Sequence, residues 1–236
     1  MTAAAPRIAI VVPILNEACA ASALAGELRD LSAAGVATEI VLVDGGSSDG
    51  SPEALGARFP AARILRAQRG RARQMNAGAR ATSAPILLFL HADTRLPRGA
   101  LEAACRAVEG GAGFGCFSVA IDSFDPRLRL ASRIINLRSR LLCSATGDQA
   151  IFARRDLFES VGGFPEIDLC EDLAFMRNAC GRARFEMAGA PPAITSARRW
   201  QKRGVMRTIA LMWAIRTGFH LGLSPRLLAR LYANVR

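Results

Sequence analysis

Ile86-Leu87-Leu88-Phe89-Leu90-His91-Ala92-Asp93 carries the strongest structural signal in the sequence. An unbroken apolar run without Gly or Pro is typical of a strand that is buried on both faces of a parallel sheet. The run stops at His91 and is followed closely by an acid, Asp93. Ligands of open α/β sheets bind outside the carboxyl ends of the strands. We therefore predict a buried parallel strand and a metal ion held by Asp93.

The chain before this stretch alternates between strands and helices. Apolar runs predict strands at 7–12, 39–43 and 63–65. Helical spacing and turn residues predict helices at 17–34, after Ser51-Pro52, and at 70–81. The first strand is expected to end at Pro13, because proline cannot donate into a central ladder. This alternation indicates an α/β fold of the nucleotide-binding type.

The alternation becomes irregular after Asp93, which predicts a mixed sheet. We expect a helix at 99–109, a Gly-rich strand at 114–121, a basic amphipathic helix at 127–142, a short strand at 149–152 and a helix at about 168–181. No repeat or linker divides the chain. The sequence therefore predicts one domain, 1–202, with a basic helical C-terminal tail, 203–236.

The tail is amphipathic, and two interpretations of it stay open. One helical face carries Val205, Ile209, Met212, Trp213 and Phe219. Arg207 lies opposite, and Arg216 interrupts the apolar arc. These arginines argue against a membrane span. The tail is expected either to pack on the domain or to lie at a membrane interface.

Composition narrows the class of protein. The 236 residues carry a net charge of +11, with arginine at every basic position except Lys202, which favours anionic partners such as phosphates or lipid headgroups. The six cysteines lack zinc-ligand spacing, and the first residues lack the pattern of a signal peptide. We expect a cytoplasmic protein, in contact with the inner face of the membrane if the tail binds lipid. No nucleic-acid-binding motif occurs, so no nucleic-acid partner is expected.

Common sequence motifs of nucleotide-binding enzymes are missing, and the candidate functional residues are acidic side chains. The chain has no P-loop and no G-x-G-x-x-G after the first strand. Acidic side chains instead follow the predicted strands or begin a helix: Glu17, Asp44, Asp49, Asp93, Asp148, Glu171 and Asp172. A single Asp-Gly turn is ordinary turn chemistry. Several carboxylates on one rim of a sheet, with arginines nearby, indicate a site for a metal and a charged ligand.

Four motifs occur in a characteristic order. These are Pro13-Ile14-Leu15-Asn16-Glu17, Val43-Asp44-Gly45-Gly46-Ser47-Ser48-Asp49-Gly50, Arg71-Ala72-Arg73-Gln74-Met75-Asn76-Ala77-Gly78-Ala79 and His91-Ala92-Asp93. With Gly147-Asp148-Gln149, Gly162-Gly163-Phe164, Glu171-Asp172 and Arg198-Arg199-Trp200, the chain resembles a family 2 glycosyltransferase of GT-A fold, a Rossmann-like mixed sheet flanked by helices. His-Ala-Asp and the Ser-Ala-Arg-Arg-Trp ending resemble a subgroup associated with arsenosugar biosynthesis.

The resemblance implies a nucleotide site and a metal site. By position, the nucleotide-binding residues would be Pro13, Leu15, Glu17, Asp44, Gly46, Asp49, Arg73, Asn76, His91 and Ala92. Asp93 matches the last acid of the family's D-x-D motif, which binds Mg²⁺ or Mn²⁺ on the donor diphosphate. His91 replaces the first acid of that motif, so whether it contacts ribose or metal stays open.

The same resemblance implies the catalytic and acceptor residues. Asp172 of the Glu171-Asp172 pair matches the general base, and neighbouring helical residues point about 100° apart, so only one of the two can face the sugar. Residues of the diphosphate and acceptor region would be Arg71, Asp148, Gln149, Arg199 and Trp200. Ser196 stands where the family's Q-x-x-R-W motif has glutamine, and the membrane spans of processive members are absent, which favours transfer of a single sugar.

The resemblance therefore implies an inverting, metal-assisted, hexosyltransferase-type enzyme. Its donor is expected to be a nucleotide-diphosphate sugar, in first place a UDP-sugar, and its acceptor is unknown. Alternatives are a non-catalytic nucleotide-sugar-binding protein at the membrane periphery, a sugar-phosphate nucleotidyltransferase and a nucleic-acid binder. The intact Asp93 and Glu171-Asp172 argue against the first, and a missing Gly-rich basic loop argues against the second.

Overall fold

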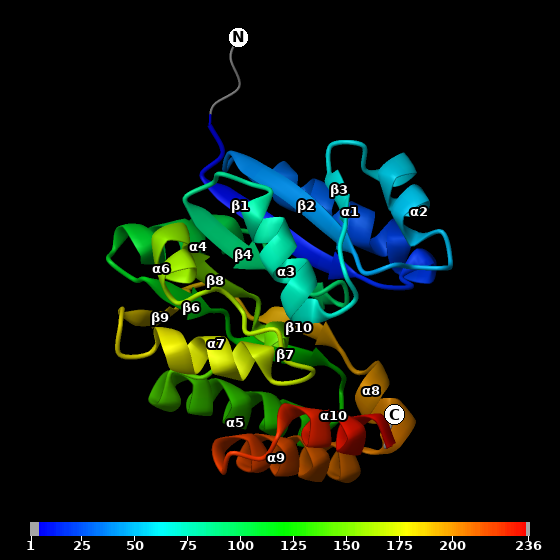
Figure 1. Ribbon diagram of the computed structural model, residues 1–236, viewed down its shortest axis with the longest axis vertical. Helices are drawn as coiled ribbons and strands as arrows, with labels where there is room; N and C mark the ends of the chain where they lie inside the picture. The colour runs from blue at the N-terminus through cyan, green and yellow to red at the C-terminus, as the bar shows by residue number, and fades with distance from the viewer. Residues whose placement is uncertain (1–4, 235–236) are drawn as a thin grey trace.

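The computed structural model describes residues 5–234, apart from the side chains at 199, 202, 203, 233 and 234. Its core is a seven-stranded sheet in the order β3-β2-β1-β4-β8-β6-β9 (Figure 1). The strands are β1 (Ile8–Ile14), β2 (Thr38–Asp44), β3 (Arg63–Arg66), β4 (Ile86–Phe89), β6 (Phe114–Cys116), β8 (Ile151–Arg154) and β9 (Phe185–Met187). A three-stranded sheet joins β5 (Thr94–Arg95), β10 (Ala193–Ser196) and β7 (Val119–Asp122).

Helices cover both faces of the large sheet. They are α1 (Ala21–Ser32), α2 (Ser51–Arg58), α3 (Arg71–Arg80), α4 (Ala100–Glu109), α5 (Pro126–Leu142), α6 (Arg155–Ser160), α7 (Glu171–Ala179), α8 (Arg198–Arg203), α9 (Val205–His220) and α10 (Pro225–Asn234), with 3-10 turns η1 (Ala18–Ala20) and η2 (Gly147–Gln149). One core cluster lies under α1, α2 and α4, and a second lies under α3, α6 and α7.

The apolar run that begins at Ile86 forms β4, the central strand of the large sheet. Leu87 and Leu88 of β4 are fully buried and face opposite core clusters. β4 pairs in parallel with β1 on one side and antiparallel with β8 on the other. This confirms the predicted mixed α/β sheet, in which the direction changes next to β4.

Two boundary predictions are wrong. β1 continues through Pro13 to Ile14. Its register with β4 ends at Val11, so at Pro13 only β2 still pairs with the strand and the missing N–H can be accommodated. The single strand predicted at 114–121 is two strands, because β6 pairs in the large sheet while β7 pairs with β10 in the small one.

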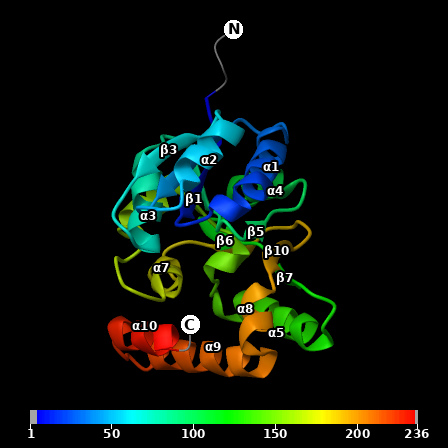
Figure 2. The ribbon, with the colours of Figure 1, turned by 90° about the vertical axis from the view of Figure 1, so that its right-hand side faces the viewer.

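The C-terminal helices form a layer beside the sheet domain. Figure 2 shows α7 between that domain and α9 and α10. Trp200 and Leu128 share an apolar cluster with Val205, Ile209 and Met212, which joins α8 and α9 to α5. Leu173 of α7 packs in another cluster with Ile215 and Phe219 of α9. Among the described residues, no helix combines the length and the apolar character that a bilayer span requires.

Candidate active site

The loops after β1 and β2 are braced against each other. The side-chain oxygen of Asn16 accepts from the Ser48 N–H at 3.0 Å, and Asp49 accepts from the Ala18 N–H at 3.0 Å. The Gln74 amide of α3 donates to the carbonyls of Ile14 and Val43 at 2.9 and 2.8 Å. Gln74 thus joins the carboxyl ends of the two strands. We call this edge of the sheet, formed by the loops after β1 and β2, the braced rim.

Asp44, Gly46 and Asp49 shape this rim. Asp44 ends β2, is 4% exposed, and accepts from the N–H groups of Gly46 and Ser47. Asp49 also accepts from the Ser51 hydroxyl and N–H, and these hydrogen bonds keep its pKa below the usual value. Asp44 therefore fixes the turn by accepting from the Gly46 and Ser47 N–H groups, and Asp49 links this turn to the loop after β1.

His91, Asp93 and Asp148 form a cluster of metal-binding type. One ligand atom from each lies within 4.8 Å of the others. His91 and Asp93 follow β4, whereas Asp148 comes from η2, and His91 Nδ1 lies 3.6 Å from Asp148 Oδ1. Two carboxylates and an imidazole suit a divalent cation, and the nitrogen ligand favours Mn²⁺ over Mg²⁺, which prefers oxygen. The sequence predicted Asp93 as a ligand and left His91 open between ribose and metal, and it did not predict Asp148 as a metal ligand.

Gly147 makes room for His91. A Cβ atom at Gly147 would lie 2.0 Å from His91 Cε1 and 2.2 Å from Nε2. Any larger residue would push the imidazole away from Asp148. The glycine of the Gly147-Asp148-Gln149 motif is therefore explained by its close contact with His91.

Glu17 faces the other side of the Asp93 loop. Ala92, Asp93, Glu17 and Arg198 line a cavity of about 260 Å³ beside β10. Burial raises the pKa of Glu17, and the negative charge of Asp93 adds to the rise. A positively charged group placed between the two carboxylates would counteract the rise in the Glu17 pKa that the charge of Asp93 causes.

Glu171 and Asp172 diverge at the start of α7. Glu171 is 3% exposed and pairs with Arg71 Nε at 3.0 Å. Burial raises the pKa of Glu171, although Arg71 opposes the rise. Asp172 accepts from the Gly147 N–H at 3.0 Å and from its own helix at Leu173. Its side chain lines a pocket of about 90 Å³ together with His91, Asp148 and Arg71.

Four other residues that were predicted to bind substrate form hydrogen bonds, an ion pair or apolar contacts with other parts of the chain. Asn76 forms two hydrogen bonds with the main chain of Phe164, and Gln149, fully buried, donates to the Phe117 carbonyl. Arg73 pairs with Glu166 at 3.2 Å, and Trp200 is buried in the cluster that joins α8 and α9 to α5. Their predicted contacts with substrate stay predictions, as do those of Pro13, Leu15 and Ala92. The side chain of Arg199 lies outside the described residues.

Arg138 and Arg216 belong to this region but were not predicted as site residues. They come from α5 and α9, and both interact electrostatically with Asp172. No motif marks them. The only signal in the sequence is that Arg216 interrupts the apolar arc of its helix.

Comparisons with known proteins agree with this architecture. Residues 9–160, more than half of the chain, match the model of glycosyl transferase family 2. No curated protein matches the chain significantly.

Solved structures share the fold. A mannosyltransferase, PcManGT from Pyrobaculum calidifontis, in complex with GDP-Man and Mn²⁺, superposes with a TM-score of 0.65 at 22% identity, over 98% of this chain and 70% of that one. S. aureus TarS 1-349 with UDP-GlcNAc gives 0.62 at 17% identity, over 81% of this chain and 59% of that one. The chain belongs to glycosyl transferase family 2.

Proposed function

We propose that this glycosyltransferase transfers one sugar from a nucleotide-diphosphate sugar to an acceptor hydroxyl with inversion. The observation that carries the proposal is that Asp172 lines the same pocket as His91 and Asp148 of the metal-type cluster. A carboxylate next to a cation site at the carboxyl end of the sheet is the arrangement that such a displacement needs.

The proposed step is a single displacement. The acceptor oxygen attacks the anomeric carbon and forms the new C–O bond, while the bond from that carbon to the diphosphate oxygen breaks. The electron pair leaves with the nucleoside diphosphate, and the acceptor proton passes to Asp172. Hydrogen bonds from the Gly147 and Leu173 N–H groups orient the Asp172 carboxylate.

A divalent cation would be held by His91, Asp93 and Asp148. The three ligand atoms lie close enough together to fit one ion, and Gly147 keeps His91 in place. A bound cation neutralises charge that develops on the departing diphosphate. Mn²⁺ fits this mixed nitrogen and oxygen set better than Mg²⁺.

The donor is proposed to be a UDP-sugar. The support is the resemblance of the Asp44 and Asp49 motifs and the braced rim that they form. The two solved structures named above carry GDP-Man and UDP-GlcNAc respectively, so a GDP-sugar is the second donor to test. The resemblance to arsenosugar-associated enzymes stays a prediction.

Nucleotide release from a donor panel tests the proposal. Purified full-length chain is incubated with UDP- and GDP-sugars, with and without Mn²⁺. We expect Mn²⁺-dependent release of nucleoside diphosphate that Asp93→Ala lowers at least tenfold, because the diphosphate loses its cation. Asp30→Ala, on the exposed face of α1, serves as the matched control. Binding of donor without any release would instead favour the non-catalytic alternative.

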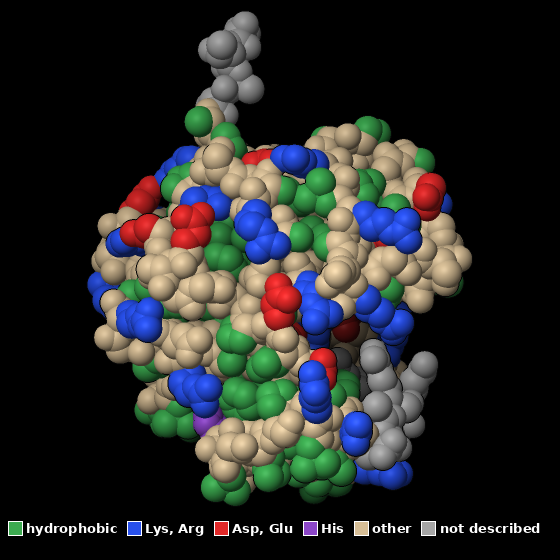
Figure 3. Space-filling model, viewed as in Figure 1, with side chains coloured by type: hydrophobic (Ala, Val, Ile, Leu, Met, Phe, Trp, Pro, Cys, Tyr) green, Lys and Arg blue, Asp and Glu red, His purple; other side chains and the backbone are tan. Residues whose placement is uncertain are grey.

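We further propose that the α5 end of the molecule contacts an anionic membrane surface. Leu130, Ile134, Leu137 and Leu141 follow helical spacing on one face of α5 and are 57%, 44%, 58% and 70% exposed. Arginines of the same helix, at positions 127, 129, 133 and 140, complement anionic headgroups. In Figure 3, hydrophobic side chains also gather at the end formed by α9 and α10.

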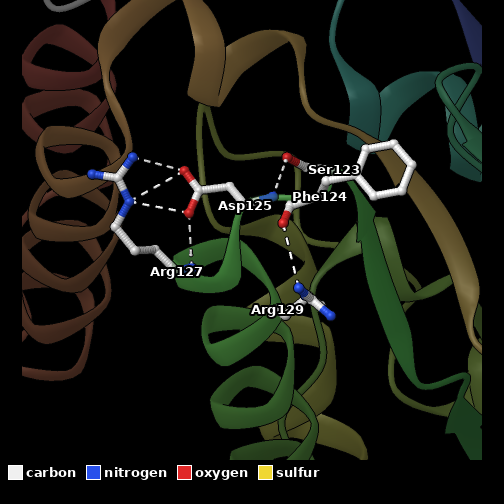
Figure 4. Close-up of polar contacts among 5 residues, drawn as sticks. All are labelled: Ser123, Phe124, Asp125, Arg127 and Arg129. Atoms are coloured by element: carbon white, nitrogen blue, oxygen red, sulfur yellow. Dashed lines mark hydrogen bonds and ion pairs between the residues drawn. The ribbon is translucent and has the colours of Figure 1, made fainter.

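The start of α5 presents an aromatic side chain to solvent. Phe124 is 99% exposed, and Figure 4 shows its ring turned away from the polar contacts around it. Asp125 caps the helix through the Arg127 N–H and pairs with the Arg127 side chain, while Arg129 donates to the Phe124 carbonyl. An exposed aromatic ring held beside arginines is typical of interfacial anchors.

A further inference from the structure

Two arginines beside Asp172 carry buried donors without acceptors. In the described part of the chain, Arg138 Nε and Nη2 and Arg216 Nη1 are buried and have no hydrogen-bond partner. Arg216 Nη2 donates to the Ser144 hydroxyl at 2.6 Å. A buried guanidinium N–H without an acceptor costs free energy, so a protein rarely keeps several of them together without a ligand.

The acids near these donors already have partners of their own. Burial lowers the pKa of Arg138 to about 10, and the charge of Arg216 adds to this effect. Burial likewise lowers the pKa of Arg216. Both side chains stay cationic at neutral pH. Asp172, with which both arginines interact, already accepts from the Gly147 and Leu173 N–H groups. Glu171 is paired with Arg71, and Asp148 lies 3.6 Å from His91 Nδ1.

The space next to them is small. The pocket of about 90 Å³ is the one that Asp172 shares with His91, Asp148 and Arg71. It is also lined by Arg216 and by the apolar side chains of Leu169, Met212 and Ile215. Pockets for drug-sized ligands occupy roughly 300–1,000 Å³. This pocket therefore suits one compact functional group with apolar atoms beside it.

We propose that this pocket binds a phosphate or similarly compact oxyanion of the acceptor, with Arg216 as the donor that lines the pocket and the neighbouring Arg138 adding positive charge and buried N–H groups. The inference rests on the proposed function, because it takes Asp172 as the base that faces the acceptor hydroxyl. The side of the Asp93 loop that carries Glu17 and the braced rim is left for the donor nucleotide. A guanidinium pair offers the planar donor arrangement that oxyanions match.

Inorganic phosphate is the probe. Phosphate is titrated into full-length protein at constant ionic strength while the melting temperature is followed, since a ligand of the folded state raises it. We expect a saturable rise for wild type and for Arg140→Met, whose side chain is exposed on the same helix as Arg138. Arg216→Met and Arg138→Met should each weaken phosphate binding at least tenfold, and Arg216→Lys should restore part of it.

The same samples separate this inference from the proposed function. Arg216→Met should keep the wild-type response to UDP with Mn²⁺, and phosphate should still bind when UDP is saturating. An equal phosphate response in Arg216→Met would overturn the inference, as would complete displacement of phosphate by UDP. If UDP fails to bind any variant while phosphate binding depends on Arg216, the donor assignment is wrong and the anion site stands.

Misfolding of the variants can be recognised in the same titration. Because Arg216 holds a buried donor without an acceptor, Arg216→Met without phosphate should melt no more than a few degrees below wild type. Glycerol phosphate and decyl phosphate then distinguish the sources of the group. If decyl phosphate binds more tightly than glycerol phosphate, the phosphate group belongs to a lipid. If the two bind equally, it belongs to a water-soluble acceptor.

Discussion

At the residue scale, Gly147 and His91 are matched in shape. The motif Gly147-Asp148-Gln149 could be found in the sequence, but its reason could not, because contact between η2 and the loop after β4 depends on the tertiary fold. We predict that Gly147→Ala displaces the His91 ring and weakens Mn²⁺ binding by about 10- to 100-fold. Electron paramagnetic resonance of Mn²⁺ titrated into the protein measures this.

The control for this variant is Gly189→Ala. A Cβ atom at Gly189 would have no neighbour within 4 Å, and the residue is exposed. Its Mn²⁺ affinity should equal that of wild type. Unchanged affinity in Gly147→Ala would mean that His91 is no ligand of the ion.

At the element scale, α3 lies against β1 and β2 at a distance that only glycine allows. A Cβ atom at Gly78 would lie 2.3 Å from Val11 Cγ1 and 3.0 Å from Val43 Cγ2. We predict that Gly78→Ala lowers the free energy of unfolding by about 1–3 kcal/mol, because the close contact outweighs the gain in helix propensity. Urea denaturation followed by circular dichroism measures the change.

Gly26 of α1, unlike Gly78, has room for a side chain. A Cβ atom there meets nothing within 4 Å, so Gly26→Ala should raise the free energy of unfolding by about 0.5–1 kcal/mol. Equal effects of the two substitutions would show that helix propensity alone governs both positions.

Elements with strong apolar runs could be predicted, and those whose pairing depends on distant strands could not. β2 and β4 were found because nearly every residue is buried. The split between β6 and β7 was missed, because β7 pairs with β10, a strand more than 70 residues later in the chain. Local sequence does not report such a partner. Arg138 and Arg216 were missed for the same reason, since they meet only when α5 and α9 pack.

At the scale of the whole molecule, the tail helices pack on the domain and α5 exposes the apolar face. The sequence left open whether the tail packs on the domain or lies at a membrane interface. In the structure Ile209 and Met212 pack against the domain, whereas Trp213 is exposed. We predict that wild type sediments with vesicles containing anionic lipid and that Leu137→Glu/Leu141→Glu stays in the supernatant. The reason is that the variant loses apolar contact and gains repulsion from the headgroups.

Ala57→Glu/Ala61→Glu is the charge-matched control, because both alanines are exposed near α2, away from α5. It should sediment with the vesicles about as well as wild type. The membrane proposal is contradicted if the α5 variant binds as wild type does, or if wild type does not bind.

Asp172 is proposed to take the proton of the acceptor hydroxyl beside a cation site. The most direct measurement is nucleoside diphosphate release from the accepted donor by Asp172→Asn, together with donor affinity by calorimetry. We predict a fall in rate of about 10²- to 10⁴-fold with donor affinity within a factor of three of wild type. Asp156→Asn, at the start of α6, should keep the full rate. Release at the wild-type rate by Asp172→Asn would show that Asp172 is not the base.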